Sequence, residues 1–168
     1  MADWKAYKET YRSESTLFDF ARVGDLRGLA NLLLQGSEID IDVTNERGYS
    51  ALMLAVYNGE QDFCEVLLRY GANPNSVDVM GNTVLMGAAY KGDLAILKLL
   101  LECGADITLV NKTKMNVRDW AVMYKRTDIL LYLDEYYPAQ VSSSKLKNMF
   151  RFIKLAFILL QNKLRSSI

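Results

Sequence analysis

Histidine is absent from the 168-residue chain, and so are the glycine spacings GxGxxG and GxxxxGK[ST] that cradle phosphate groups. Without histidine the chain has no Ser-His or Cys-His nucleophile pair, no histidine base and no histidine metal ligand. Without the glycine loops it has no recognisable nucleotide site. We therefore expect a protein that is not an enzyme and that uses neither a metal nor a cofactor.

Cysteine is scarce, and an export signal is not recognisable. The two cysteines are Cys64 and Cys103, and positions 3, 5, 8 and 9 carry charges where a secretory signal would be apolar. Thiols in a chain without export are expected to stay reduced and buried. The localisation expected is cytoplasmic, with a peripheral membrane position or, for a bacterial source, delivery into a host cell as alternatives.

Charge is balanced overall but unevenly distributed. All 20 acidic residues lie at or before Glu135, so residues 1–138 carry 14 basic against 20 acidic residues, a net charge of −6. Residues 139–168 carry six basic residues and no acid. An acidic body disfavours sequence-independent binding to nucleic acid, which needs clustered positive charge. We expect no nucleic-acid partner.

Glycine and leucine recur at a fixed interval. Three glycine pairs stand 33 residues apart, and the Leu-Leu pair at 67–68 returns at 100–101; the glycines are Gly48 and Gly81, Gly59 and Gly92, Gly71 and Gly104. The repeat extends in degenerate form on both sides, giving about four units near 16–48, 49–81, 82–114 and 115–137. A period of this length is typical of stacked repeats that bury a shared core.

Each unit has the signals of two short helices and a turn. Ser50 and Thr83 are expected to cap the first helix, and Gly59 and Gly92 to end it. Apolar residues at helical spacing predict the second helix over 60–70 and 93–103. The segment "ANPNSVDVMGN" that follows is rich in turn residues. A helix pair this short needs its neighbours to cover its apolar face.

The segment "GNTVLMGAAYKGDLAILKLLLECGADITLVN" resembles the ankyrin repeat, G-x-TPLH-x-A-x-x-x-G followed by a Leu-Leu helix and G-A-D-x-N. The resemblance covers about 120 residues, two units closely and two loosely. Pro and His are missing from the tetrad, and Met53 and Met86 replace the histidine, which suggests a more apolar joint between repeats. The resemblance implies a fold that binds other proteins through a concave face.

The resemblance also implies which positions contact a partner. The turn residues at these positions are Glu46, Arg47, Tyr49, Val79, Met80, Asn82, Thr113 and Met115. The first-helix residues are Arg22, Tyr57, Asn58, Tyr90, Lys91, Met123 and Tyr124. Because Tyr57 and Tyr90 are one period apart, they should stand side by side, and with Met80, Met123 and Tyr124 they form an aromatic and Met-rich strip. The alternative is that these tyrosines cover apolar joints between repeats.

Both ends of the chain predict helices. Trp4, Tyr7 and Tyr11 form one stripe, typical of a helix capping the first repeat. The segment 145–165 is amphipathic, with basic residues Lys147, Arg151 and Lys154 on one face and an additional apolar edge at Phe152, Leu155 and Leu159. Three readings stay open: this helix packs on the last repeat, docks in a partner or self-associates, or lies on an anionic membrane surface.

Together these patterns predict an all-α ankyrin-repeat solenoid of about four helix-turn-helix/hairpin units. Residues 1–14 are expected to form a capping helix, 15–137 the repeat domain, and 138–168 a linker with the basic amphipathic helix. The function expected is a non-catalytic protein-interaction module, acting as an adaptor, inhibitor or scaffold. The alternative is a peripheral membrane-associated protein tethered by its C-terminal helix.

Overall fold

The computed structural model describes residues 17–34 and 39–138. The predictions for the 1–14 capping helix and for the tail, including Lys147, Arg151, Phe152, Lys154, Leu155 and Leu159, lie outside the described residues. The chain divides into two compact units, Met1–Tyr132 and Leu133–Ile168. Of the second unit the structure describes residues 133–138, in which Leu133 is buried.

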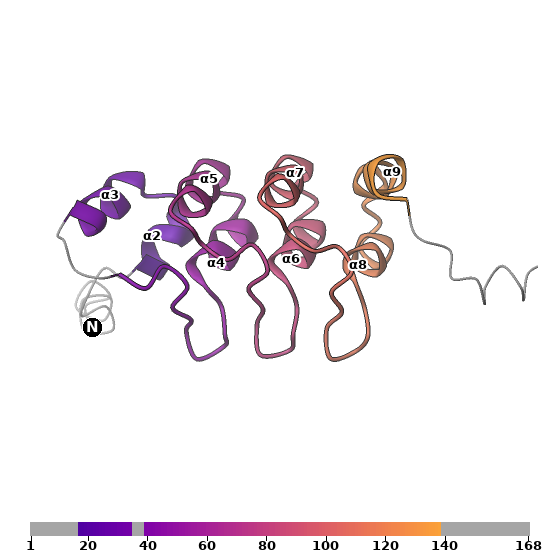
Figure 1. Cartoon of the computed structure of the whole chain (residues 1–168), viewed down its shortest axis with the longest axis horizontal. Helices are drawn as coiled ribbons and strands as arrows, with labels where there is room; N and C mark the ends of the chain where they lie inside the picture. Colours follow the sequence, from indigo (N-terminus) through magenta and orange to yellow (C-terminus); the bar gives the residue numbers. More distant parts are fainter. Residues whose placement is uncertain (1–16, 35–38, 139–168) are drawn as a thin grey trace, which may run out of the picture. The chain divides into compact units, whose positions relative to one another are not determined.

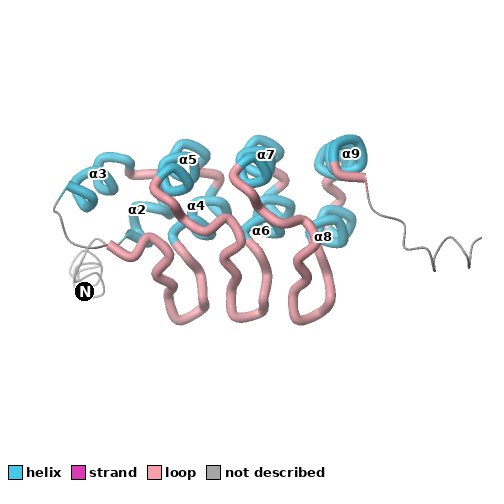
Figure 2. Tube along the Cα trace, in the orientation of Figure 1, coloured by secondary structure: helices cyan, strands magenta, loops and turns pink. Residues whose placement is uncertain are grey.

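The described elements are eight short helices, labelled as in Figure 1. They are α2 (Leu17–Val23), α3 (Leu26–Leu34), α4 (Ala51–Asn58), α5 (Gln61–Arg69), α6 (Val84–Lys91), α7 (Leu94–Glu102), α8 (Val117–Met123) and α9 (Thr127–Tyr136). Helices α2, α4, α6 and α8 pack one after another in one row, and α5 packs beside α7 in a second row. Loops project from the first row between successive helix pairs (Figure 2). This arrangement confirms the all-α repeat architecture.

The helix ends follow the capping signals of the sequence. Ser50, Thr83 and Asn116 stand 33 residues apart as N-caps of α4, α6 and α8, and each side chain accepts a backbone N–H of the first turn. Gly59 and Gly92 end α4 and α6 in the left-handed conformation, with φ of 80° and 81°. This conformation suits glycine because it has no Cβ to clash with the backbone.

The core is built from the repeated apolar positions. Leu67, Leu100 and the period-related alanines Ala55, Ala88 and Ala121 are fully buried; the small alanine side chains allow helices of the first row to approach closely. Met53 and Met86 are also fully buried, and the Met86 Sδ accepts the Thr83 N–H at 3.4 Å. Methionine at this position therefore fills the joint and still satisfies a backbone donor.

The two thiols differ in their surroundings. Cys64 is buried within α5, where burial raises the pKa of its thiol to about 12. Cys103 is exposed because it is the C-cap of α7, at the end of the helix where the chain turns away. The expectation of two buried thiols is wrong for Cys103.

The loops of the first row form fingers that hold one another. In each finger one Asn or Asp side chain accepts two backbone N–H groups of the turn, at Asn45, Asp78 and Asn111. Adjacent fingers are joined by backbone hydrogen bonds, from Val79 N–H to Arg47 O at 3.2 Å and from Lys112 N–H to Met80 O at 3.0 Å. These hydrogen bonds therefore fix the fingers relative to one another.

Two lysines occupy left-handed positions in the degenerate last unit. Lys114 (φ 63°) and Lys125 (φ 56°) stand one period after Gly81 and Gly92. A non-glycine residue is destabilised by about 1–2 kcal/mol in this conformation. Replacing it with glycine recovers only part of this free energy, because glycine has more conformational freedom in the unfolded chain. Lys114→Gly and Lys125→Gly are each expected to raise the free energy of unfolding by about 0.5–1 kcal/mol, measured by urea denaturation.

Lys112→Gly is the matched control for these two variants. Lys112 is an exposed lysine in the same finger as Lys114, and its φ is not in the left-handed region. Glycine there adds unfolded-state entropy without relieving strain. A stabilisation by Lys112→Gly equal to that of Lys114→Gly would contradict the interpretation.

Candidate partner-binding groove

Five aromatic rings from three successive repeats form a continuous cluster, which we call the aromatic cluster: Tyr49, Tyr57, Tyr90, Trp120 and Tyr124. Ring centroids are 5.8 Å apart for Tyr49 and Tyr57, and 6.0 Å apart for Tyr57 and Tyr90. Tyr90 continues the contacts to Trp120 at 6.4 Å and to Tyr124 at 4.8 Å. Aromatic pairs at these separations add stability beyond their buried area.

The repeat itself positions these rings. Tyr57 and Tyr90 are the seventh residues of α4 and α6, so stacking the two helices brings their rings together. Tyr124 is the C-cap of α8 and lies one residue beyond the equivalent position, while Trp120 enters from within α8. The Trp120 Nε1 is buried and has no hydrogen-bond partner among the described residues. Packing against Tyr90 and Tyr124 is what holds this ring in place.

Two adjacent hollows run along the cluster. The first, which we call the aromatic hollow, has a volume of about 480 Å³ and is lined by Tyr49, Leu54, Tyr57, Asp78, Asn82, Tyr90, Trp120 and Tyr124. The second, the arginine hollow, has a volume of about 370 Å³ and is lined by Arg22, Asn45, Glu46, Arg47, Tyr49 and Leu54. Because Tyr49 and Leu54 line both, the two hollows adjoin, and we call them together the groove.

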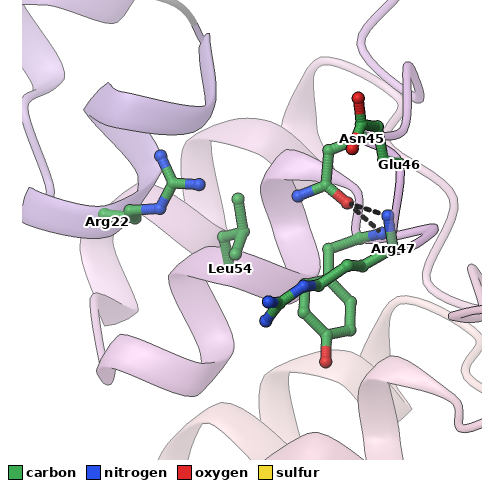
Figure 3. A pocket seen from close by; sticks show the side chains of 6 residues that line it. Arg22, Asn45, Glu46, Arg47 and Leu54 are labelled. Carbon is green, nitrogen blue, oxygen red and sulfur yellow. Dashed lines mark hydrogen bonds between the residues drawn. The ribbon is translucent and has the colours of Figure 1, made fainter. Parts of the chain in front are cut away.

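The two ends of the groove differ in charge. Figure 3 shows Arg22 from α2 and Arg47 from the first finger on opposite sides of Leu54. Arg22 also pairs with Asp19 at 2.8 Å on its own helix. At the other end, Asp78 is the charged residue in the lining of the aromatic hollow. The arginine hollow therefore combines Arg22 and Arg47 with the carboxylate of Glu46, whereas Asp78 is the charged residue that lines the aromatic hollow.

Asp78 is held by a network of amides in the fingers. It is 8% exposed, and its two carboxylate oxygens accept the Met80 N–H, the Asn82 N–H and the Asn82 Nδ2, each at 2.8 Å. The Asn82 Oδ1 in turn accepts the Asn111 Nδ2 at 2.7 Å. This chain of hydrogen bonds links two fingers and fixes the carboxylate beside the aromatic hollow.

Two of three equivalent positions on the first-row helices line the aromatic hollow. Leu54, Gly87 and Trp120 are equivalent residues, one period apart, on α4, α6 and α8. A Cβ at Gly87 would lie 3.5 Å from the Tyr57 ring, an ordinary contact distance. Gly87 itself is buried, so the Tyr57 ring lies close to the α6 backbone at this position.

The environment of Tyr57 disfavours negative charge. Burial, followed by the nearby charge of Asp78, raises the pKa of the Tyr57 hydroxyl from 10.0 to about 12. The folded chain therefore holds this proton more tightly than the unfolded chain does. By linkage, this group leaves stability unchanged below about pH 9 and lowers it as pH rises from 10 to 12.

Tyr57→Phe is expected to reduce the loss of stability between pH 10 and pH 12. The reason is that phenylalanine has no proton for the unfolded chain to release. Cys64 titrates in the same range, so the comparison is made between the parent chain and Tyr57→Phe, each retaining Cys64. Denaturation midpoints at pH 8 and pH 11, together with tyrosinate absorbance, provide the measurement. Equal losses in the two chains would contradict the burial of this hydroxyl.

The structure brings together about half of the residues that the sequence predicted for partner binding. Those that line the groove are Arg22, Glu46, Arg47, Tyr49, Tyr57, Asn82, Tyr90 and Tyr124. Those that lie outside its lining are Asn58, Val79, Met80, Lys91, Thr113, Met115 and Met123. Met80 and Met123 are each 49% exposed, yet they do not extend the aromatic strip into the hollows.

Some of the outer residues have local roles instead. The Asn58 Nδ2 donates to Leu54 O at 2.7 Å, next to the end of α4. The Thr113 hydroxyl donates to Asn111 Oδ1 at 2.7 Å within its finger. Val79 and Met80 sit at the second finger, where their backbones join the adjacent fingers. These contacts stabilise the frame around the groove.

Sequence reasoning missed four lining residues: Asn45, Leu54, Asp78 and Trp120. A signal for Trp120 was present, because it stands one period after Gly87 and two after Leu54. The degenerate last unit concealed it. Asp78 was taken as part of a turn, which is correct, but its position beside the rings depends on the stacking of fingers over helices.

Within the described ranges, His, Cys, Asp and Glu form no group of three or more able to hold a metal ion. None of the helices in the described part of the chain has the length and apolar character needed to cross a membrane.

Comparison with known proteins identifies the repeat. The family described as Ankyrin repeats (3 copies) matches residues 17–111, which is more than half of the chain. The chain belongs to the ankyrin-repeat family. Ankyrin repeats are, as a class, protein-interaction modules.

The chain is similar to parts of longer proteins. The chain is 33% identical over 109 residues to the inactive serine/threonine-protein kinase TEX14 of Mus musculus, covering 65% of this chain and 7% of that protein. It is 41% identical over 66 residues to the protein fem-1 homolog A-like of Mus musculus, covering 39% of this chain and 10% of that protein.

A putative ankyrin repeat-containing protein of Treponema pallidum (strain Nichols) is 29% identical over 123 residues, covering 73% of this chain and 41% of that protein. The chain thus spans less than half the length of each of these three relatives. What they share with it is the repeat.

Proposed function

We propose that this chain is a non-catalytic cytoplasmic interaction module, an adaptor, inhibitor or scaffold, that holds a segment of a partner protein in the groove. The observation that carries the proposal is the aromatic cluster along two joined hollows. Tyr90 at its centre is 43% exposed. Tyrosine and tryptophan supply large contact areas at small entropic cost, which is why they dominate binding hot spots.

The rigidity of the groove supports the same proposal. Its walls come from the fingers, which are tied by hydrogen bonds between neighbours, and its floor from the closely packed first-row helices. A preformed site binds with less entropic cost than one that must first be ordered. An extended partner segment can therefore contact several repeats at once.

Affinity capture with Tyr90→Ala tests this function. The full chain is immobilised, a partner is captured from native lysate, and the dissociation constant of that partner is then measured for each variant. Tyr90→Ala is expected to weaken binding by at least about tenfold, as for a central aromatic hot spot. Thermal melting checks that the variant stays folded.

Tyr70→Ala is the matched control. Tyr70 is a 60% exposed tyrosine at the C-cap of α5, outside the lining of the groove. Its removal should leave partner affinity unchanged. If Tyr90→Ala and Tyr70→Ala bind the partner equally well, the groove is not the binding site.

A further inference from the structure

We propose that the aromatic hollow binds the cationic side chain of a lysine or arginine in a segment of another protein, with Asp78 providing the opposing charge. This proposal rests on the proposed function, since it names the chemistry of the partner for the same groove. Three observations support it: the angles between the rings, the charge of Asp78, and the fact that the turn at Asp78 does not require a charged side chain.

The rings of the aromatic cluster meet at steep angles. The Tyr90 ring plane makes angles of 72° with Tyr57, 80° with Trp120 and 84° with Tyr124. In an edge-to-face pair, the edge of one ring contacts the face of the other ring. The two faces of the first ring are not covered by that contact. The negative π faces attract a cation within about 6 Å of the ring centre. Rings at right angles around one hollow can present such faces from several sides.

The residues that line the aromatic hollow contribute negative charge. Asp78 is the charged member of the lining, and it makes no ion pair with any residue in the described part of the chain. The Arg126 guanidinium lies instead at the end of α6, where it donates to Tyr90 O at 2.7 Å. A cation entering the hollow would gain both the ring faces and a carboxylate of low exposure, where screening by water is reduced.

The turn at position 78 does not require a charge. Asn45 and Asn111 are the equivalent residues of the neighbouring fingers, and each amide oxygen accepts the same two backbone N–H groups at 2.9–3.0 Å. Asparagine is therefore sufficient for this finger geometry. Among these three equivalent residues, Asp78 is the one that lines the aromatic hollow, and it is the one that carries a carboxylate.

Other occupants fit the lining less well. A carboxylate or phosphate would meet the charge of Asp78 and the ring faces, both of which repel anions. Burial and, after it, the charge of Asp78 raise the pKa of the Tyr57 hydroxyl, so a negative charge is disfavoured at this place too. An apolar side chain would gain contact area but would bring no positive charge to the carboxylate of Asp78.

The test uses lysine and norleucine, each blocked as the N-acetyl N-methylamide, as a matched probe pair. Norleucine keeps a straight aliphatic side chain but lacks the ammonium group. The full chain carries Trp4→Phe, so that of its two tryptophans Trp120 remains as the fluorescent reporter. At constant ionic strength, blocked lysine is expected to bind at least about fivefold more tightly than blocked norleucine. Equal affinities would overturn the proposal.

Asp78→Asn tests the charge itself. It should reduce the affinity for blocked lysine by about fivefold or more, and leave the affinity for blocked norleucine unchanged. In this variant an amide NH₂ faces the Asn82 Nδ2, which now donates to Asp78. The double variant Asp78→Asn with Asn111→Asp removes that conflict, because the Asn82 amide can reverse while the net charge is kept. Lysine binding should stay weak in the double variant; recovery of full affinity there would overturn the role of Asp78.

The captured partner separates this proposal from the proposed function. If partner binding depends on Tyr90 but is unaffected by Asp78→Asn and by the double variant, the groove binds through another chemistry and the cation proposal fails alone. If partner binding does not depend on Tyr90, the proposed function fails first.

The chain's own basic tail is the competing occupant. A full chain in which all six basic residues of the tail are replaced by glutamine should bind blocked lysine as the parent does; these are Lys145, Lys147, Arg151, Lys154, Lys163 and Arg165. A tightening of about tenfold or more would mean that the tail of this chain or of a second copy fills the hollow, and would overturn the assignment to a different protein.

Discussion

Leu100→Ala is expected to lower the free energy of unfolding by about 2–5 kcal/mol. Leu100 lies in α7 with 0% of its surface exposed, and it belongs to the Leu-Leu pair that recurs with the repeat. Alanine removes the buried methyl groups and leaves a cavity that closely packed helices cannot fully close. Urea denaturation monitored by circular dichroism gives the difference between variant and parent.

Leu131→Ala is the control for this loss. Leu131 is a leucine in helix α9 and is 71% exposed, so the same chemical change should alter stability by no more than about 0.5 kcal/mol. Equal destabilisation by the two substitutions would show that the repeat register assigned to α7 is wrong.

Gly48→Ala is expected to cost about 2–5 kcal/mol, for two separate reasons. Gly48 has φ of 75°, which an L-residue adopts only with strain. In addition, its Cβ would lie 2.8 Å from the Val79 nitrogen and 3.1 Å from the Asp78 carbonyl carbon. Both atoms are backbone of the next finger, so relieving the clash means moving that finger.

Gly71→Ala separates these two costs. Gly71 has φ of 89°, yet a Cβ there would meet nothing within 4 Å. It should therefore cost about 1–2 kcal/mol from backbone strain alone. The difference between the two variants in thermal or urea denaturation measures the packing of adjacent fingers. A Gly48→Ala loss no larger than the Gly71→Ala loss would contradict this close approach.

The fold was predictable because its signals are local and repeated. Ser50 and Thr83 cap helices where the sequence indicated, and the observed α5 and α7 lie within one residue of the predicted 60–70 and 93–103 at each end. A helix cap or a left-handed glycine depends on a few neighbouring residues. Two units in the same register therefore fix most of the architecture.

The groove was predictable only in part because it depends on contacts between repeats. Tyr57 and Tyr90 could be paired by their period, whereas the degenerate last unit concealed Trp120, although it keeps the period of Leu54 and Gly87. Asp78 and Asn82 lie in a turn by sequence and reach the hollow only through the stacking of fingers. The sequence analysis placed Met80 and Met123 in the aromatic strip, but neither of these exposed side chains belongs to the lining.

Gly87 makes this groove suited to bump-and-hole engineering. A glycine within a helix costs about 0.5–1 kcal/mol relative to alanine, and alanine would meet the Tyr57 ring at an ordinary distance of 3.5 Å. A side chain larger than alanine there would displace the Tyr57 ring, which lines the aromatic hollow, and so change the shape of the hollow. Partner segments with a correspondingly smaller side chain could then be selected for binding to the altered chain. Such a pair would be orthogonal, because the selected segment would not bind the groove of the parent chain.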